Sequence, residues 1–319
     1  MTTTAGTGCH VGVDVGGTKV LAVRLAAEGS GGAVTDHPGE AAVAAVAYRP
    51  MPGREAPPEA VEVAVAEAAL EAAGGRPIAA IGVSAAGLVD RAGDTYLFGA
   101  HLPWRDAPVR ARLEQRTGVR VVLDNDANCA AYAEVRAGAA RGVDDVVLVT
   151  VGTGIGGALV LGGRVVRGAH GLAGEFGHVQ VVPDGLACEC GLRGCWEQYC
   201  SGRALERVTR VALGRHLDGP EVAARARRGD GVAREAFGSV GTWLGVGVAG
   251  LVSAYDPELV VVGGGVASVG DLLLEPARVA LRTSLQGTDH RPVPPLVPAA
   301  LGPEAGAIGA ALLARDGRG

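Results

Sequence analysis

Three apolar runs in this chain each end in a glycine-rich turn, and this pattern constrains the fold more than any other feature of the sequence. The runs and their turns are VGVDVGGTK (11–19), VLVTVGTGIGG (147–157) and LVVVGGG (259–265). A short apolar run bounded by glycine is typical of a buried strand. Because helical segments separate these strands, we predict a duplicated α/β fold in which a nucleotide binds in a cleft between two lobes.

The remaining elements alternate in the same way. Further strands are expected over 20–25, 43–48 (an edge strand), 78–83 and 119–123, with a hairpin over 158–166. Helices are expected over 58–73, 107–116 with Asp106 as N-cap, 126–137, most of 203–255, and 303–314. The uncharged run 236–255 has nearly the length of a membrane span, but its glycines favour a helix buried in a protein core.

Composition excludes several classes of function. The 319 residues include 29 Lys and Arg against 34 Asp and Glu, a formal net charge of −5, so no general attraction to nucleic acid or anionic membranes is expected. Residues 1–9 are uncharged and too short for a secretory signal, which predicts a soluble, cytoplasmic protein. Residues 29–57 are rich in Gly, Pro and Ala and indicate no function.

The glycine turns are candidates for nucleotide binding. Glycine lets a phosphate approach the backbone closely, where Thr and amide N–H groups donate to its oxygens, and Asp14 is expected to hold Mg²⁺ through water. The Gly triplet would lie against a flat ring such as adenine. The alternative is that all three are ordinary turns, the first needing positive φ. The candidates are Asp14, Gly16, Gly17, Thr18, Lys19, Thr153, Gly154, Gly264 and Gly265.

The sequence DNDAN (124–128) lies where a strand gives way to a helix. A carboxylate there points out from the carboxyl end of the strand, as a general base for a sugar hydroxyl must. We assign Asp126 as this base and leave Asp124 as a helix cap or a structural acceptor.

Four residues have the spacing of a closed zinc site. One imidazole and three thiolates bind Zn²⁺ tetrahedrally, and such a site is structural. The expected ligands are His178, Cys188, Cys190 and Cys195. The alternatives are a disulfide, scattered buried thiols, or Cys200 in place of one ligand. Cys9 and Cys129 are expected to be ordinary buried thiols.

Two carboxylates flank this cysteine cluster. Glu175 and Glu197, together with His178, are the types of side chain that bind sugar hydroxyls. His178 would use one ring nitrogen for zinc and the other for the sugar. The alternative is that both acids are solvated loop charges.

Six segments together resemble the ROK family of bacterial sugar kinases and repressors, and most closely its ATP-dependent glucokinases from high-GC actinobacteria. In order, the segments are DVGGTK, GVSAAGLVD, LDNDANCAAYAE, VTVGTGIGG, GEFGHVQVVPDGLACECGLRGCWEQYCSG and DPELVVVGGGV. The resemblance covers roughly residues 10–314.

The resemblance implies an actin-like, ribonuclease H-like fold in which two α/β lobes close on ATP and sugar. We expect residues 1–125 and 303–319 in the smaller lobe and residues 126–302, with the zinc-binding loop, in the larger. It implies Asp126 as base, zinc on the four ligands above, and a homodimer or homotetramer. The implied hexose ligands are Asn125, Glu175, His178 and Glu197. The family's repressors carry an N-terminal helix-turn-helix, for which no room is expected here.

One departure from the resemblance concerns the sugar. Related glucokinases usually have an Asn-Leu pair before the Trp of this segment, whereas this chain has His101-Leu102. His101 is therefore a candidate substrate contact whose charge state would matter, the alternative being a surface loop residue. We expect phosphorylation of a hexose at its 6-hydroxyl, with glucose as the leading substrate. The rivals are a kinase for an amino sugar, fructose or a cyclitol, a sugar-sensing regulator without DNA binding, and polyphosphate as donor.

Overall fold

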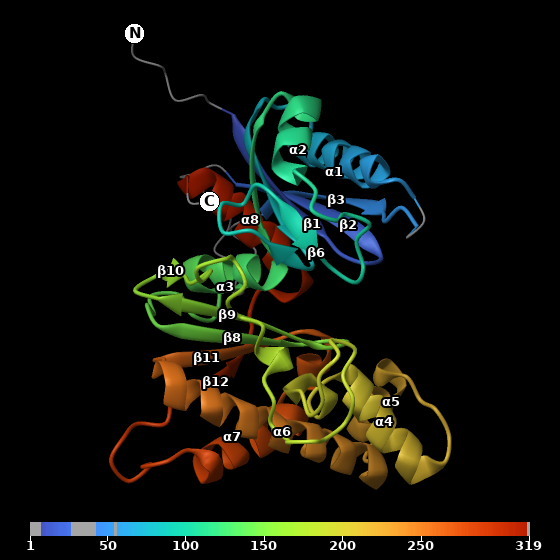
Figure 1. Ribbon diagram of the computed structural model, residues 1–319, viewed down its shortest axis with the longest axis vertical. Helices are drawn as coiled ribbons and strands as arrows, with labels where there is room; N and C mark the ends of the chain where they lie inside the picture. Colours follow the sequence, from blue (N-terminus) through green and yellow to red (C-terminus); the bar gives the residue numbers. More distant parts are fainter. Residues whose placement is uncertain (1–7, 27–42, 54–55, 318–319) are drawn as a thin grey trace. The chain divides into compact units, whose positions relative to one another are not determined.

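The computed structural model describes residues 8–26, 43–53 and 56–317 (Figure 1). Residues 1–7, where no secretory signal is expected, lie outside this part of the chain, as do 27–42 and 54–55 from the Gly-, Pro- and Ala-rich stretch.

The described elements alternate between strands and helices. In chain order they are β1 (Cys9–Val15), β2 (Lys19–Leu25), β3 (Val43–Pro50), α1 (Pro58–Ala73), β4 (Ile78–Ala85), β5 (Leu88–Val89), β6 (Tyr96–Phe98), α2 (Val109–Thr117), β7 (Arg120–Asn125), α3 (Asp126–Ala137), β8 (Val146–Val151), β9 (Ile155–Leu161), β10 (Arg164–Val165), η2 (Phe176–His178), η3 (Trp196–Gln198), α4 (Gly202–Leu213), α5 (Gly219–Arg227), α6 (Gly231–Tyr255), β11 (Leu259–Gly263), η4 (Gly265–Val269), α7 (Asp271–Ser284), β12 (Leu296–Pro298), η5 (Gly302–Glu304) and α8 (Ala305–Asp316).

The first sheet has the strand order β3-β2-β1-β4-β7. Strands β1, β2 and β3 are antiparallel neighbours, whereas β4 and β7 continue the sheet in parallel from β1. Helices α1 and α2 cover one face and share a core with the odd-numbered valines of β1. Helix α8 covers the other face with α3 packed against it, in a core that includes alternate residues of β2 (Figure 1). The sheet is thus covered on both faces over β1, β2, β4 and β7, which are mostly buried and apolar, whereas most residues of the edge strand β3 are partly or fully exposed.

The second sheet has the order β10-β9-β8-β11-β12, so counted within each sheet both follow the order 3-2-1-4-5. In both, the two strands of a hairpin pair antiparallel, a later strand pairs in parallel with the hairpin's first strand, and a last strand pairs in parallel with that later strand. The repetition predicted from the glycine turns is confirmed by this shared topology. The edge position predicted for the strand beginning at Val43 is also confirmed.

The chain divides into two compact units, residues 1–142 with 164–173 and 300–319, and residues 143–163 with 174–299. The division differs from the expected one at three places. Helix α3 belongs to the first unit because it packs on α8, and Arg164–Ala173 also groups with that unit. The C-terminal return begins at Ala300 rather than at residue 303.

Helix α6 is the glycine-rich helix expected over part of 236–255. Its glycines allow close packing: a Cβ on Gly245 would lie 2.2 Å from the Ala277 carbonyl oxygen of α7, and one on Gly247 would lie 2.0 Å from the Trp196 ring. Among the described residues α6 is the one helix long and apolar enough to cross a membrane, and 56% of its most apolar window is buried within the protein.

The expected cap of the helix after residue 106 is wrong. Asp106 has a φ of 43° in the preceding turn, and α2 begins at Val109 without a side-chain cap. Pro108 is the N-cap residue, with a φ of −76° and a ψ of 65°, and its ring offers no side-chain acceptor.

Candidate active site and metal centre

The first glycine turn joins β1 to β2 within a hairpin. Gly16 N–H donates to the Lys19 carbonyl at 3.1 Å, and neither Gly16 nor Gly17 has positive φ. A Cβ on Gly16 would meet nothing closer than the Lys19 carbonyl at 3.5 Å. The backbone conformation therefore does not require glycine here, which argues against the simple turn explanation and leaves open backbone for a ligand to approach.

The second glycine turn, between β8 and β9, has the same property. Neither Gly152 nor Gly154 has positive φ, and a Cβ on Gly152 would meet nothing within 4 Å. The Gly triplet is different. Gly264 has a φ of 88°, and a Cβ there would lie 2.4 Å from the Val151 carbonyl oxygen, so this glycine is required by the fold, whereas Gly265 has open space.

Asp14 closes β1 beside two residues that the sequence analysis did not single out. Strand pairing places it opposite Ser84, whose hydroxyl donates to Asp14 Oδ1 at 2.5 Å. A Cβ on Gly306 of α8 would lie 2.7 Å from the same oxygen. Burial raises the pKa of Asp14, although the Ser84 hydrogen bond and the Lys19 charge act to lower it. The available signal for Ser84 was a lone hydroxyl at the end of an apolar strand.

The DNDAN turn joins β7 to α3, as predicted. Asn125 is the N-cap of α3, and its Oδ1 accepts from Ala127 N–H at 2.9 Å and Asn128 N–H at 3.1 Å. Its Nδ2 donates to the Gly87 carbonyl at 3.0 Å and to Asp126 Oδ1 at 2.9 Å. These four bonds use the full capacity of the amide, so a sugar contact from Asn125 requires one of them to exchange.

Asp126 is the first residue of α3. Its Oδ1 accepts two hydrogen bonds, one from Asn125 Nδ2 and one from the Ala127 backbone N–H, each at 2.9 Å. Two donors on one oxygen fix the plane of the carboxylate, which lies at the positive, N-terminal end of the α3 dipole. Asp124 is a structural acceptor rather than the cap, because Asn125 occupies the cap position.

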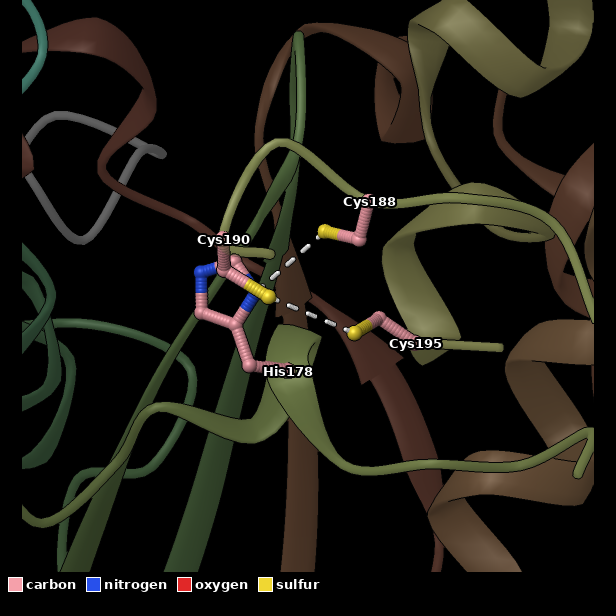
Figure 2. A group of neighbouring side chains, drawn as sticks. All are labelled: His178, Cys188, Cys190 and Cys195. Atoms are coloured by element: carbon pink, nitrogen blue, oxygen red, sulfur yellow. Dashed lines mark hydrogen bonds between the residues drawn. The ribbon is translucent and has the colours of Figure 1, made fainter. Parts of the chain in front are cut away.

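The four predicted zinc ligands lie together, with their ligand atoms all within 4.8 Å of one another (Figure 2). Cys190 Sγ is 3.6 Å from Cys195 Sγ, and Cys188 Sγ is 3.7 Å from His178 Nδ1. Zinc–sulfur bonds of about 2.3 Å at tetrahedral angles place neighbouring ligand atoms about 3.6–3.8 Å apart. The residues present therefore fit a tetrahedral Zn²⁺ ion, and Cys200 is not part of the group.

The cysteine thiols are free, and their surroundings shift their pKa values in different directions. None of the six cysteines, all in the described part, forms a disulfide. The Leu192 backbone N–H lowers the pKa of the Cys190 thiol, whereas burial, followed by the neighbouring thiols, raises the pKa of Cys195 to about 12. Cys129 and Cys200 are fully buried, as expected of inert thiols, and Cys9 is partly buried.

Glu175 and Glu197 lie on either side of the His178 ring. His178 Nδ1 is 3.9 Å from Glu197 Oε1, and Nε2 is 3.9 Å from Glu175 Oε2. With Nδ1 toward Cys188, Nε2 is the nitrogen left toward Glu175. Burial raises the pKa of Glu175, with His178 opposing and Glu197 adding to the shift. Both acids are thus grouped at His178 rather than scattered as loop charges.

The same cluster borders the second glycine turn. A Cβ on Gly154 would lie 2.5 Å from Glu197 Oε2, so glycine there makes room for this carboxylate. Gly202 N–H donates to the Gly152 carbonyl at 2.7 Å and ties the start of α4 to the same turn. The second unit therefore brings a glycine turn, two acids and the cysteine cluster into one region.

His101 lies against the first glycine turn. A Cβ on Gly17 would lie 3.2 Å from His101 Cβ, and the residue is half-buried. His101 is therefore a partly exposed loop residue next to this turn, and both interpretations of it stay open.

The predicted site residues are divided between the units. The first unit holds Asp14, Gly16, Gly17, Thr18, Lys19, His101, Asn125 and Asp126. The second holds Thr153, Gly154, Glu175, His178, Cys188, Cys190, Cys195, Glu197, Gly264 and Gly265.

Comparison with known proteins finds similarity over nearly the whole chain. The ROK family model matches residues 10–317. The glucokinase of Streptomyces coelicolor is 39% identical over 97% of this chain and 98% of that protein. A ROK glucokinase from Streptomyces griseus, solved with glucose and AMPPNP, superposes with a TM-score of 0.83 at 40% identity, covering 97% of this chain and all of that one. A ROK hexokinase from Thermus thermophilus gives 0.78 at 39% identity, covering 97% and 98%. The predicted actin-like α/β fold is confirmed by these likenesses together with the two matching sheets.

Proposed function

Because the chain belongs to the ROK family, we propose that it is a glucokinase that transfers the γ-phosphoryl group of ATP to the 6-hydroxyl of glucose. The observation that carries the proposal is the Asp126 carboxylate, held in plane at the start of α3 by two donors on one oxygen. A kinase acting on a sugar needs such a base to orient the hydroxyl and accept its proton. The near full-length similarity to glucokinases supports ATP as donor and glucose as acceptor.

In the proposed reaction the sugar O6 forms a bond to the γ-phosphorus as the bond to the bridging oxygen of ADP breaks. Asp126 takes the O6 proton. The two glycine turns donate backbone N–H groups to the transferred phosphate, with Thr18, Lys19 and Thr153 beside them. Gly264 and Gly265 lie along the adenine.

Asp14 is proposed to hold Mg²⁺. The residue fits this role, because a buried carboxylate whose pKa is raised by burial gains most from a nearby cation. When bound, the ion supplies positive charge that neutralises the phosphate oxygens. Ser84 keeps the Asp14 carboxylate in one orientation through its hydrogen bond.

The hexose is proposed to contact six side chains. They are His101, Asn125, Asp126, Glu175, His178 and Glu197. Zinc on His178 Nδ1 and the three thiolates would hold the imidazole so that Nε2 addresses a sugar hydroxyl. We also propose a cytoplasmic homodimer or homotetramer, which sedimentation analysis tests.

The test of the function is an assay of ADP release with a panel of sugars. We expect ATP with glucose to give the highest kcat/KM among glucose, mannose, fructose, glucosamine and cyclitols, with polyphosphate as a poorer donor. Asp126→Asn is expected to lower kcat by about 10² or more, the effect of losing a general base, with little change in glucose KM. Exposed Asp289 supplies the matched control, Asp289→Asn, which should behave as wild type. Near-normal turnover of Asp126→Asn would show that another group is the base.

The zinc site is tested by elemental analysis. About one zinc per chain is expected, the content of one closed site. Cys190→Ser should lose the metal and weaken glucose binding, whereas Cys200→Ser should retain it. A fully active wild type without zinc contradicts the assignment.

The role of His101 is tested by specificity. His101→Asn should change the rank order of kcat/KM among the sugars. The difference in activation free energy between two sugars should shift by about 1–3 kcal/mol, the cost of leaving one buried polar group unpaired. An unchanged rank order with an unmoved glucose KM would place His101 outside the sugar site.

A further inference from the structure

Asp124, next to the proposed base, is a buried carboxylate with every bond accounted for. The residue is 3% exposed. Its Oδ1 accepts from Asn125 N–H at 2.8 Å and from Asn128 Nδ2 at 2.9 Å. Its Oδ2 accepts from Arg167 Nε at 2.9 Å and Nη2 at 2.6 Å. A buried carboxylate is stable only with such a cation and such donors, so Arg167 supplies the charge that compensates Asp124.

Arg167 comes from a segment that groups with the first unit, although the chain before and after it belongs to the second. The segment Arg164–Ala173 is closed by Ala173 N–H donating to the Arg167 carbonyl at 3.1 Å. It is also held at Gly171, whose φ is 86° and where a Cβ would lie 2.3 Å from the Val89 carbonyl oxygen. Arg167 is thus anchored by its backbone as well as by its guanidinium.

The bonds on Asp124 continue directly to the proposed base. Asn125, whose backbone N–H is on Asp124, caps α3 with its side-chain oxygen and donates from its side-chain nitrogen to Asp126 Oδ1. Arg167 therefore reaches Asp126 through two intermediates, Asp124 and Asn125. Loss of the guanidinium would leave Asp124 to compete for the donors that hold Asn125.

The charges around this turn also indicate that Arg167 balances the carboxylates beside the proposed base. Burial raises the pKa of Cys129 most strongly, and Asp124, Asp14 and Asp126 raise it further, whereas Arg167 lowers it. The pKa of the Cys129 thiol is thus affected by the charges of all three carboxylates and, in the opposite direction, by the charge of Arg167. Removing that cation would leave like charges concentrated at the start of α3.

We propose that Arg167 is a positioning residue for phosphoryl transfer, which holds the Asp124–Asn125–Asp126 turn in its working geometry through the two-point bond to Asp124. The proposal rests on the proposed function, in which Asp126 is the base. It adds a residue from a different segment of the chain to the catalytic apparatus and assigns Asp124 its role as the link.

The test compares Arg167→Lys, Arg167→Gln, the double variant Asp124→Asn/Arg167→Gln, and the control Arg164→Gln. Arg164 is exposed on the same segment. Arg167→Gln is expected to lower kcat by about 10- to 100-fold, the scale of a misplaced catalytic group, with the KM for ATP within about twofold of wild type. Arg167→Lys, which keeps the charge but not the paired geometry, should fall between wild type and Arg167→Gln. The double variant should exceed Arg167→Gln in kcat, because it buries no unpaired charge.

The outcomes separate this proposal from the function it rests on. Wild-type protein without sugar kinase activity refutes the proposed function. An active wild type, with Arg167→Lys and Arg167→Gln matching Arg164→Gln in kcat, refutes the positioning role. A general structural effect would instead lower the melting temperature and the fraction of folded protein while leaving kcat per folded molecule unchanged, and this also overturns the proposal. If Arg167→Gln does not fold, Arg167→Lys decides: a reduced kcat at normal melting temperature supports the role, and a wild-type kcat refutes it.

Discussion

Among substitutions that each remove one carboxylate, we expect the replacement of Glu134 to destabilise this protein most. Glu134 is 1% exposed on α3. Its Oε2 accepts from Ala139 N–H at 2.7 Å, and its Oε1 accepts from Ala300 N–H at 3.0 Å and Leu301 N–H at 2.9 Å. One carboxylate thus satisfies three backbone donors, on the chain just after α3 and at the start of the C-terminal return.

The magnitude follows from these three donors. Glu134→Ala leaves each of them without its acceptor, at about 1–3 kcal/mol apiece, with the lower values applying where water enters, so we expect a total of about 3–5 kcal/mol. Glu134→Gln keeps an oxygen for Ala300 and Leu301 but turns an NH₂ group toward the Ala139 N–H. Two donors then face each other, and we expect about half the effect of the alanine variant.

The assay is thermal and urea denaturation followed by circular dichroism. Glu134→Ala should lower the melting temperature by roughly 5–15 °C. The controls are Glu235→Ala and Glu235→Gln on α6, where the side chain is exposed and changes within about 0.5 kcal/mol are expected. If Glu134→Ala is no less stable than Glu235→Ala, the carboxylate does not hold these backbone donors and the reasoning fails.

Three further predictions concern packing and pH. Gly12→Ala should destabilise the fold by about 3 kcal/mol or prevent folding, because its Cβ would lie 1.8 Å from the Ala307 carbonyl oxygen of α8. Gly250→Ala, whose Cβ would meet nothing within 4 Å, should stabilise α6 by about 0.5–1 kcal/mol. Equal urea midpoints for the two variants would contradict these predictions. Burial acts to raise the pKa of Asp316, but the Tyr132 hydrogen bond and nearby arginines outweigh it, so the folded pKa lies below 3.8. Its stabilisation is then present above about pH 4 and lost as pH falls through the folded pKa, so the difference in melting temperature between wild type and Asp316→Asn should narrow from pH 6 to pH 3. A constant difference would refute it.

Local sequence chemistry was sufficient for much of the site. The cysteine cluster could be predicted because closely spaced thiols and one His can converge within a short loop, whatever the rest of the chain does. The start of α3 could be predicted because a run of Asp and Asn after an apolar strand is a cap signal. The identity of the cap, Asn125 rather than Asp124, could not, since it depends on what the Asp124 side chain meets elsewhere.

Other features depend on partners far away in the chain. Ser84 is matched to Asp14 by parallel strand pairing across 70 residues, and Arg167 reaches Asp124 across 43. A sequence pattern shows that these side chains are polar in apolar surroundings, but not which charge each will meet.

The sequence by itself determined the kinds of element, the two glycine turns, the repeated α/β pattern and the grouping of His178 with three cysteines, because these follow from periodicity and from contacts between near neighbours. Only the tertiary structure decided which glycines serve an open backbone and which are required by φ or packing, as at Gly16 and Gly264. It alone showed which partner each buried polar group has: Arg167 compensates the Asp124 charge, and Glu134 accepts from backbone N–H groups. The physical reason is that desolvation makes a buried polar group dependent on its particular partner, and that partner is chosen by the packing of the whole chain.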